Sequence, residues 1–191
     1  MADKQLNNLL ALQEDSELYG KNGTEHGKFK AGFLGVHNLL HVQEQKPAGT
    51  TGGTFTADAW RTRAINAVKC NNIIGASLSG LFAVTLPSGI YFADGYATGY
   101  QVEAHCARLF NITDSAELVI GTMAFTNKSY GCENFAKMSG IFSIDETKAI
   151  EFQHICDTTM ATYGFGGRSA TTFTMASEVN IYSDLKIWKL S

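Results

Sequence analysis

The feature that most constrains the fold is an alternation of apolar and polar side chains in the second half of the chain. In residues 134–144, apolar or small residues stand at every second position: Ala136, Met138, Gly140, Phe142 and Ile144. Polar Lys137, Ser139 and Ser143 stand between them. Because successive side chains of a β-strand point to opposite faces, this period buries one face of a strand.

Similar short runs recur about every ten residues, which predicts about eight to ten strands and no helix after residue 40. Residues 148–156 repeat the alternation, and Pro87-Ser88-Gly89 supplies a turn after the apolar run 81–86. In the last run, the residues expected to share a buried face are Val179, Ile181, Leu185 and Ile187. Strands with one apolar face pack as two sheets, so the sequence predicts an all-β fold, best fitted by a jelly-roll sandwich.

The chain changes character near residue 40, which predicts an N-terminal arm, residues 1–40, and a knob domain, residues 41–191. Residues 5–18 carry a loose helical stripe of leucines, and the glycine-rich residues 20–35 favour an extended chain. This pattern predicts a short extended or partly helical arm that anchors the knob. The apolar residues available for anchoring are Leu6, Leu9, Leu10, Phe29, Phe33 and Leu34. The alternative is a terminus without fixed structure.

The composition narrows the class of partner. The chain is 45% hydrophobic and 17% charged, below the roughly 25% charged residues of a typical soluble domain. A surface short of charge favours contact with another subunit. The formal net charge is −3 and no block of Lys or Arg occurs, so nucleic-acid binding is not expected. Arg61 and Arg63 share one face of a strand, where we expect surface ion pairs.

The first residues lack the pattern of a secretory signal peptide, and no apolar run is long enough to insert into a membrane. We therefore expect a soluble protein, or part of a soluble particle, that is made in the cytoplasm of its cell. The four cysteines form no C-x-x-C pair, and in a chain without a secretion signal they are expected to be free thiols.

The sequence predicts no catalytic residue, no metal site and no cofactor. His105 and Cys106 are adjacent, so on a strand they point to opposite faces and cannot pair directly. His154 and Cys156 share the apolar face of their run, which favours a packed, hydrogen-bonded core histidine over a nucleophile–base pair. The histidines also lack metal-binding spacings such as H-E-x-x-H.

Several segments, in one consistent order, resemble a domain common in the appendage proteins of tailed bacteriophages. They are residues 53–63, 86–96, 105–114, 150–154, 158–166 and 182–190. That domain is similar to the trimeric jelly roll of the complement globular head and the tumour-necrosis-factor-like proteins. The resemblance implies a homotrimer on the virion surface and does not imply catalysis.

The resemblance implies a tail-fibre or host-attachment component whose receptor is a host surface glycan or protein. Only about 40 residues precede the domain, which favours a compact knob clipped by its arm to a capsid, tail or fibre protein. One alternative is a capsid decoration, cement or head-fibre protein that docks on the shell. A glycan-processing enzyme is a further alternative, which no residue pattern supports.

Aromatic residues suggest where a receptor would bind. The loop residues Tyr130, Tyr163, Phe165 and Arg168 are of the types that dominate binding hot spots. The alternative is that the aromatics pack in the core and along the trimer axis. Tyr91 and Trp188 stand at positions expected to be exposed and available for the trimer interface.

Overall fold

The computed structural model describes residues 17–22, 25–30, 38–80, 82–167 and 179–191. The chain divides into two compact units, Met1–His37 and Asn38–Ser191, which are described separately. The elements of the described residues are all strands, as the sequence predicts. No helix among them is long and apolar enough to cross a bilayer.

The first unit contains an antiparallel hairpin of β1 (Glu17–Asn22) and β2 (Glu25–Lys30). Its register runs from the pair Glu17 and Lys30 to the pair Asn22 and Glu25. The extended chain expected for the glycine-rich segment is therefore paired with itself over these residues. Of the predicted helical stripe, only Glu17 and Leu18 are described, and both lie in β1.

Phe29 lies in β2, whereas the other predicted anchoring residues fall outside the described residues. These are Leu6, Leu9, Leu10, Phe33 and Leu34. The anchoring role of all six stays a prediction.

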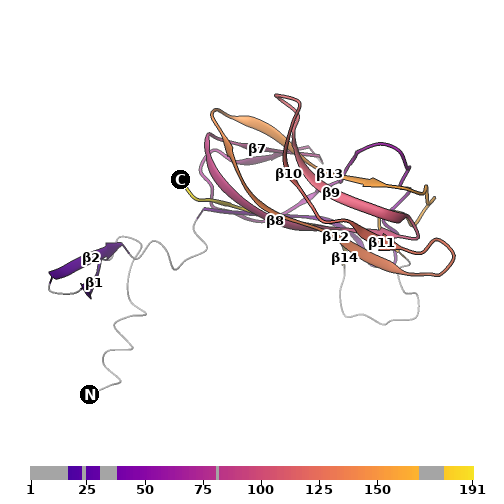
Figure 1. The fold of residues 1–191 in the computed structure, drawn as a ribbon, viewed down its shortest axis with the longest axis horizontal. Coiled ribbons are helices and arrows are strands. Elements are labelled where there is room, and N and C mark those ends of the chain that lie inside the picture. Colours follow the sequence, from indigo (N-terminus) through magenta and orange to yellow (C-terminus); the bar gives the residue numbers. More distant parts are fainter. Residues whose placement is uncertain (1–16, 23–24, 31–37, 81, 168–178) are drawn as a thin grey trace, which may run out of the picture. The chain divides into compact units, whose positions relative to one another are not determined.

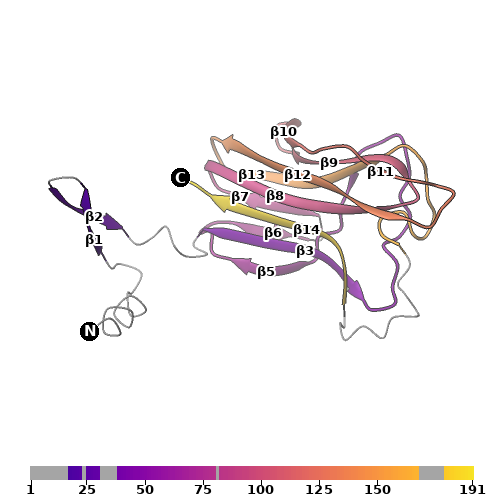
Figure 2. The same ribbon diagram turned by 60° about the horizontal axis from the view of Figure 1, so that its bottom comes forward.

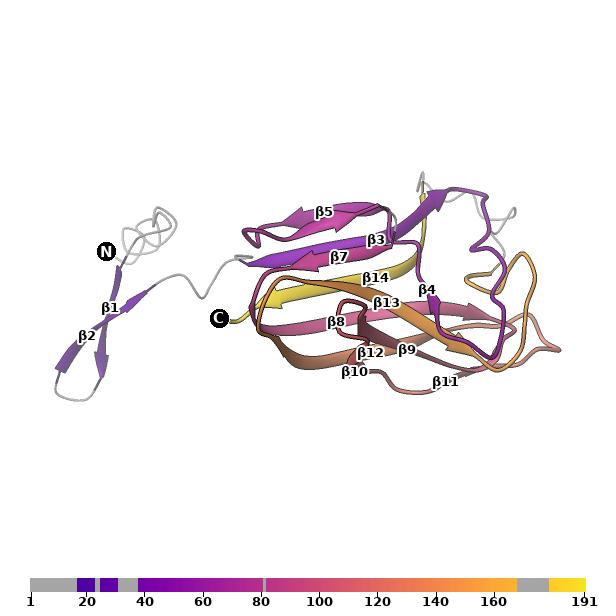
Figure 3. The ribbon, with the colours of Figure 1, turned by 90° about the horizontal axis from the view of Figure 1, so that it is seen from above.

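The second unit is a sandwich of two antiparallel sheets, seen from above in Figure 3. The first sheet has the order β12 (Glu133–Ile144), β8 (Gly89–Tyr100), β14 (Val179–Lys189), β3 (Leu39–Pro47), β5 (Ala67–Asn71). The second has the order β10 (Ala116–Ile120), β9 (Glu103–Asn111), β13 (Lys148–Cys156), β7 (Ala83–Leu86), β6 (Ser77–Ser79). β11 (Ala124–Thr126) also pairs with β9, and β4 (Arg61–Thr62) also pairs with β13. The short strands β4, β6 and β11 raise the strand number above the prediction.

The core lies between the two sheets and confirms the alternation. On β12, Met138 is 1% exposed and Ala136 is fully buried, whereas Lys137 and Ser139 are exposed. On β13, Ile150 and Phe152 are each 1% exposed. These side chains join Leu40, Val42, Leu185 and Ile187 in one apolar cluster that closes the sandwich.

The structure contradicts one prediction of burial and one prediction of exposure. Val179 and Ile181 are 37% and 39% exposed, because a bulge between Ile181 and Ser183 shifts β14 against β3 and reverses the parity of the strand. Tyr91 is fully buried and stacks on Phe142 with ring centroids 5.3 Å apart, because the odd positions of β8 face the core.

The two ends of the sandwich differ. At one end Lys189 N donates to Asn38 O (2.9 Å) and Ile90 N donates to Ser191 O (3.2 Å), so this unit begins and finishes there. β8 runs away from that end for 12 residues, a span of about 35 Å. The far end carries residues 47–60, 127–132 and 157–167, a group of connections that we call the loop end (Figures 1 and 2).

Candidate functional site

A buried arginine organises the loop end. Arg63 is 1% exposed, and its Nε and Nη2 lie 2.9 Å and 2.7 Å from Oε2 of Glu44. Its Nη2 also donates to the backbone oxygens of Phe165 and Tyr182, both at 2.9 Å. Its Nη1 donates to Thr98 O at 3.4 Å. One guanidinium therefore joins β3, β8, β14 and the loop that contains Phe165.

This position corrects the expected surface role of Arg63. β4 ends at Thr62, so the strand alternation that would place Arg63 beside Arg61 stops one residue too early. Arg63 N donates instead to Phe152 O at 2.8 Å, and its side chain enters the interior. The sequence contained one indication of a buried partner for Arg63. Glu44 lies on the same face of its strand as the core residues Leu40 and Val42.

The Arg63–Glu44 pair is costly to bury, because both side chains carry a charge that loses its contact with water. Burial lowers the pKa of Arg63, while the charge of Glu44, its hydrogen bond and the charge of Glu133 oppose this shift. A buried ion pair stabilises a fold only weakly compared with apolar packing, but the loss of one partner leaves an uncompensated charge. We therefore expect the loss of either partner to destabilise the contacts that Arg63 makes in the loop end.

Aromatic rings continue from Arg63 to two buried histidines. The guanidinium lies 4.4 Å from the ring centroid of Phe165, which stacks on Phe55 at 4.3 Å. Phe55 lies 4.6 Å from the ring of His154. Nε2 of His154 is 2.9 Å from Nδ1 of His105, and both histidines are fully buried. The buried position predicted for His154 is confirmed.

Both imidazoles are neutral at pH 7. Burial, assisted by the charge of Arg63, lowers the pKa of His105 to about 4. Burial, Arg63 and His105 lower the pKa of His154 well below its usual value. The rings share one hydrogen bond, and the other nitrogens, Nε2 of His105 and Nδ1 of His154, have no hydrogen-bond partner among the described residues. The predicted hydrogen bonding of His154 is therefore only half satisfied.

The thiols beside this pair are poor nucleophiles. Burial raises the pKa of Cys156 to about 12, and its Sγ lies 3.4 Å from Thr158 O. Burial also raises the pKa of Cys106, whose Sγ lies 3.4 Å from Gly121 O. The four cysteines are free in the structure. Among the described residues, no group of three or more His, Cys, Asp or Glu side chains could hold a metal ion.

The predicted receptor-contact residues separate into different environments. Tyr130 is 72% exposed, and Tyr163 is half-buried against Tyr100 with ring centroids 6.1 Å apart. Phe165 uses its ring between Phe55 and Arg63. Arg168 lies outside the described residues.

Tyr100 connects the two loops that carry these tyrosines. Its backbone N donates to Gly164 O at 3.1 Å, and Gln101 N donates to Cys132 O at 3.3 Å. The loops of Tyr130 and Tyr163 therefore lie at the same end of the sandwich.

The outward face of the five-stranded sheet carries an apolar row across four strands. The residues directly opposite one another in this row are Ile141, Phe92, Trp188 and Leu39. Ile141 is 66% exposed, and the rings of Phe92 and Trp188 lie 5.6 Å apart. We call these four residues the apolar row.

A polar cluster lies beside the apolar row. Asp184 is 5% exposed and accepts hydrogen bonds from Gln43 Nε2 (2.5 Å) and Lys186 Nζ, and its Oδ2 lies 2.7 Å from His41 Nε2. Burial raises the pKa of Asp184, but the hydrogen bonds of Lys186, Gln43 and His41 outweigh it and hold the pKa below its usual range. The cluster is internally paired in the single chain.

A second apolar surface lies along the sheet edge formed by β10, β11 and the segment between them. Its residues are Ile120, Met123 and Phe125, which are 50%, 68% and 59% exposed. Thr122 N donates to Lys137 O at 2.9 Å, which holds this segment against β12. We call these three residues the apolar edge.

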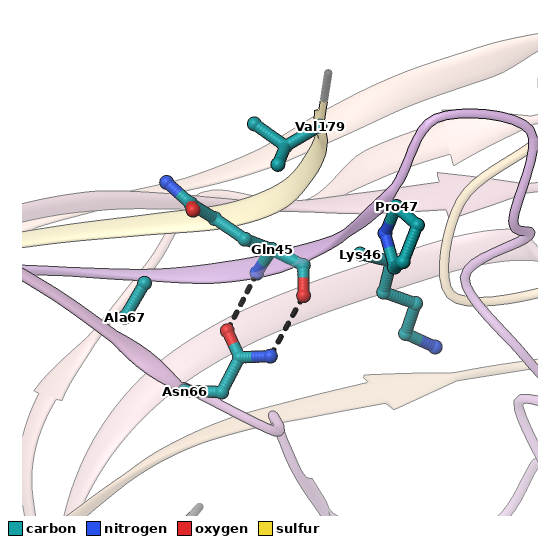
Figure 4. Close-up of a pocket in the computed structure, with 6 residues that line it drawn as sticks. All are labelled: Gln45, Lys46, Pro47, Asn66, Ala67 and Val179. Carbon is teal, nitrogen blue, oxygen red and sulfur yellow. Dashed lines mark hydrogen bonds between the residues drawn. The ribbon is translucent and has the colours of Figure 1, made fainter.

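A shallow hollow of about 350 Å³ lies between β3, β5 and β14 (Figure 4). Gln45 N donates to Asn66 Oδ1 at 2.8 Å, and Asn66 Nδ2 donates to Gln45 O at 2.7 Å. The lining residue Lys46 donates its amine to Gly52 O and lies 5.8 Å from the ring centroid of Tyr182. Its charge is therefore engaged away from the hollow, which offers a ligand mainly amide and apolar groups.

No protein-family model and no curated protein matches the chain. Among solved structures, the globular domain of zebrafish complement 1qA protein is similar at 9% identity and a TM-score of 0.50, covering 81% of this chain and 98% of that chain. Murine APRIL at pH 5.0 is similar at 12% identity and a TM-score of 0.51, covering 81% of this chain and 99% of that chain. The second unit has the complement-globular-head and tumour-necrosis-factor-like jelly-roll fold.

At these identities the similarity shows the fold alone. It confirms the predicted jelly roll, whereas neither of these two structures is a phage protein, so the appendage assignment stays a prediction.

A substitution at Gly166 tests how tightly the loop end packs. Gly166 has φ +154°, and a Cβ added there would overlap the ring of Tyr182. We expect Gly166→Ala to destabilise the unit by about 1–3 kcal/mol, because overpacking forces side chains or backbone to move. Gly80→Ala is the control, since a Cβ there meets nothing within 4 Å and only its φ of +61° is unfavourable. Urea unfolding of both variants measures the difference, and equal midpoints would contradict the close approach to Tyr182.

Proposed function

We propose that this chain is a homotrimeric surface knob of a phage particle that takes part in host attachment. The jelly-roll fold, the separate N-terminal unit and the tyrosines of the loop end support the proposal. The N-terminal unit would hold the knob on a capsid, tail or fibre protein. Catalysis is not part of the proposal, because His105 and His154 are fully buried and burial makes the thiols of Cys106 and Cys156 poor nucleophiles.

The observation that carries self-association is the presence of exposed apolar side chains at two different places on one chain, Ile141 of the apolar row and the three residues of the apolar edge. The apolar row lies on the outward face of the five-stranded sheet, and the apolar edge lies along β10 and β11. Contact between unlike surfaces of identical copies repeats by rotation and can close into a ring. Jelly rolls of this kind commonly form trimers, so three copies are the expected closure.

A trimer of this kind would cover both apolar surfaces. In our proposal, the apolar edge of one copy packs on the apolar row of the next. Ile141, which is 66% exposed in the single chain, and Phe125, which is 59% exposed, would become buried. The internally paired cluster around Asp184 would lie inside the same interface, where its hydrogen bonds are already formed.

Host attachment would use the loop end. Because this unit begins and finishes at the opposite end, a knob held through Asn38 leaves the loop end free to meet another surface. Tyr130, at 72% exposure, is the most accessible aromatic residue of the predicted contact set among the described residues. Tyrosine offers a large, rigid contact surface for a glycan or a protein at low entropic cost.

Cell binding tests the attachment role. We expect the fluorescently labelled full-length protein to bind intact cells of at least one strain in a panel of bacteria at micromolar concentration. Tyr130→Ser should weaken that binding by at least about tenfold if Tyr130 is a hot spot. Ile74→Ser, at a 96% exposed residue outside the loop end, is the matched control and should bind normally. Binding to phage particles without binding to any cell would favour a capsid decoration protein instead.

A further inference from the structure

The buried histidine pair has no part in the proposed attachment surface and points to a separate role. We propose that the His105–His154 pair is an acid-sensitive latch, which holds the loop end closed at neutral pH and releases it in mild acid. Its geometry, its sealed surroundings and its position between two loops support this role. The latch does not depend on the attachment role.

The two rings come from neighbouring strands and are enclosed by uncharged groups. His105 lies on β9 and His154 on β13, and these strands are paired along this stretch. A Cβ added to Gly99 would meet the ring of His105 at 2.9 Å, and Phe55 covers the ring of His154. The rings therefore have little room to rotate or to admit water.

The hydrogen-bond pattern favours neutral rings. With one facing nitrogen as donor and the other as acceptor, each neutral imidazole uses one nitrogen in the 2.9 Å contact. A first added proton goes to an outer nitrogen, where no acceptor lies among the described residues. A second added proton makes both facing nitrogens donors, which turns the contact between His105 and His154 into a repulsion.

The charged groups around the pair do not compensate a proton. Arg63 is the cation that acts on both rings. Glu44 is committed to Arg63, and the Glu133 carboxylate accepts the backbone N–H of Gly167. The thiols of Cys106 on β9 and Cys156 on β13 are neutral.

The other elements against the rings present Phe55, Gly99 and Phe165, which carry no charge. An imidazolium in this site therefore lacks a carboxylate partner among the described residues.

Two loops depend on the latch. Gly53 N donates to Thr162 O (3.0 Å), Phe55 N to Met160 O (3.0 Å) and Phe165 N to Gly53 O (3.1 Å), so residues 52–57 and 158–167 close together over the histidines. Loss of the pair would loosen both loops, including Tyr163, against the remaining bonds of Phe165 O to Arg63 and of Gly164 O to Tyr100. The opposite end keeps its own bonds between Lys189 and Asn38, so the opening is expected to be local.

The direction of the pH effect follows from the lowered pKa values. A histidine with a usual pKa of 6.5 that falls to about 4 in the folded state binds protons better when released. Its contribution to closure is complete above the usual pKa and is lost as the pH falls from about 6.5 to 4. The latch is therefore closed at pH 7 and opens across this window.

Pulsed hydrogen–deuterium exchange of the full-length protein, corrected for the intrinsic pH dependence of exchange, tests the latch. We expect peptides from residues 52–57 and 158–167 to exchange at least about tenfold faster at pH 4.5 than at pH 7. Peptides from residues 89–93 should keep their protection. Full protection of both loops at pH 4.5, or simultaneous loss over the whole unit, would overturn a local latch.

Variants identify the residues responsible. The double variant His105→Leu/His154→Leu fills the site with apolar side chains and should keep both loops protected at pH 4.5. Asp145→Asn, which removes a titratable carboxylate that is 90% exposed and follows β12 at the end opposite the loop end, should open as the wild type does. An unchanged acid response in the double variant would refute the latch.

A readout on the wild type keeps the test valid if the double variant does not fold. The ¹³Cε1 resonances of His105 and His154 should remain those of neutral imidazoles until the loops lose protection. Protonation of either ring while both loops stay protected would contradict the latch.

Discussion

Glu44→Gln is expected to destabilise the second unit by about 3–5 kcal/mol, because it removes the carboxylate that compensates a buried charge. Arg63 is 1% exposed, its Nε donates a hydrogen bond to Oε2 of Glu44, and its Nη2 forms an ion pair with the same oxygen at 2.7 Å. The amide of glutamine fills the same space but carries no charge. Denaturant unfolding of wild type and variant, followed by tryptophan fluorescence, measures the loss as a lower midpoint at an unchanged slope.

Two controls separate the buried charge from other effects. Glu117→Gln removes a carboxylate that is 43% exposed and lies 3.3 Å from Arg108, and it should cost less than about 1 kcal/mol. The double variant Arg63→Met/Glu44→Leu removes both charges and should recover part of the stability lost in Glu44→Gln, since apolar residues often replace a buried ion pair well. A Glu44→Gln variant as stable as the wild type would show that the pair does not organise the loop end.

The sequence predicts the fold where neighbouring residues determine the outcome. The alternation on β12 depends only on which side chains in one segment are apolar, and every even position from Ala136 to Ile144 faces the core or lies close to it. The same argument predicts the buried face of β13. It fails in β14, because a bulge near Ile181 depends on how that strand pairs with β3.

The site was harder to predict because it depends on contacts between distant segments. Arg63 forms its hydrogen bonds with Glu44, Phe165 and Tyr182 only after the sheets have packed. The His105–His154 contact requires β9 and β13 to be neighbours, which no local pattern gives. Glu44 was the available signal, since an acid on the apolar parity of a strand requires a buried partner.

Single charges placed in the proposed interface should convert the trimer into single chains. Ile141→Asp places a carboxylate in the apolar row, and Phe125→Asp places one in the apolar edge. Each should cost about 2 kcal/mol or more per interface, because a carboxylate would be desolvated without a partner, which corresponds to about thirtyfold weaker association. Ile74→Asp, at a residue 96% exposed and outside both surfaces, is the control and should still associate.

Mixing the two variants distinguishes the geometry of the interface. If the apolar edge of one copy packs on the apolar row of the next, Phe125→Asp keeps an intact row and Ile141→Asp keeps an intact edge. A mixture should then form a heterodimer through one undamaged interface, although each variant alone stays near the 20.7 kDa mass of one chain. Sedimentation velocity measures these masses. An interface of row against row would leave Phe125→Asp dimeric and give no complementation, because a surface that meets its own copy forms a two-fold dimer.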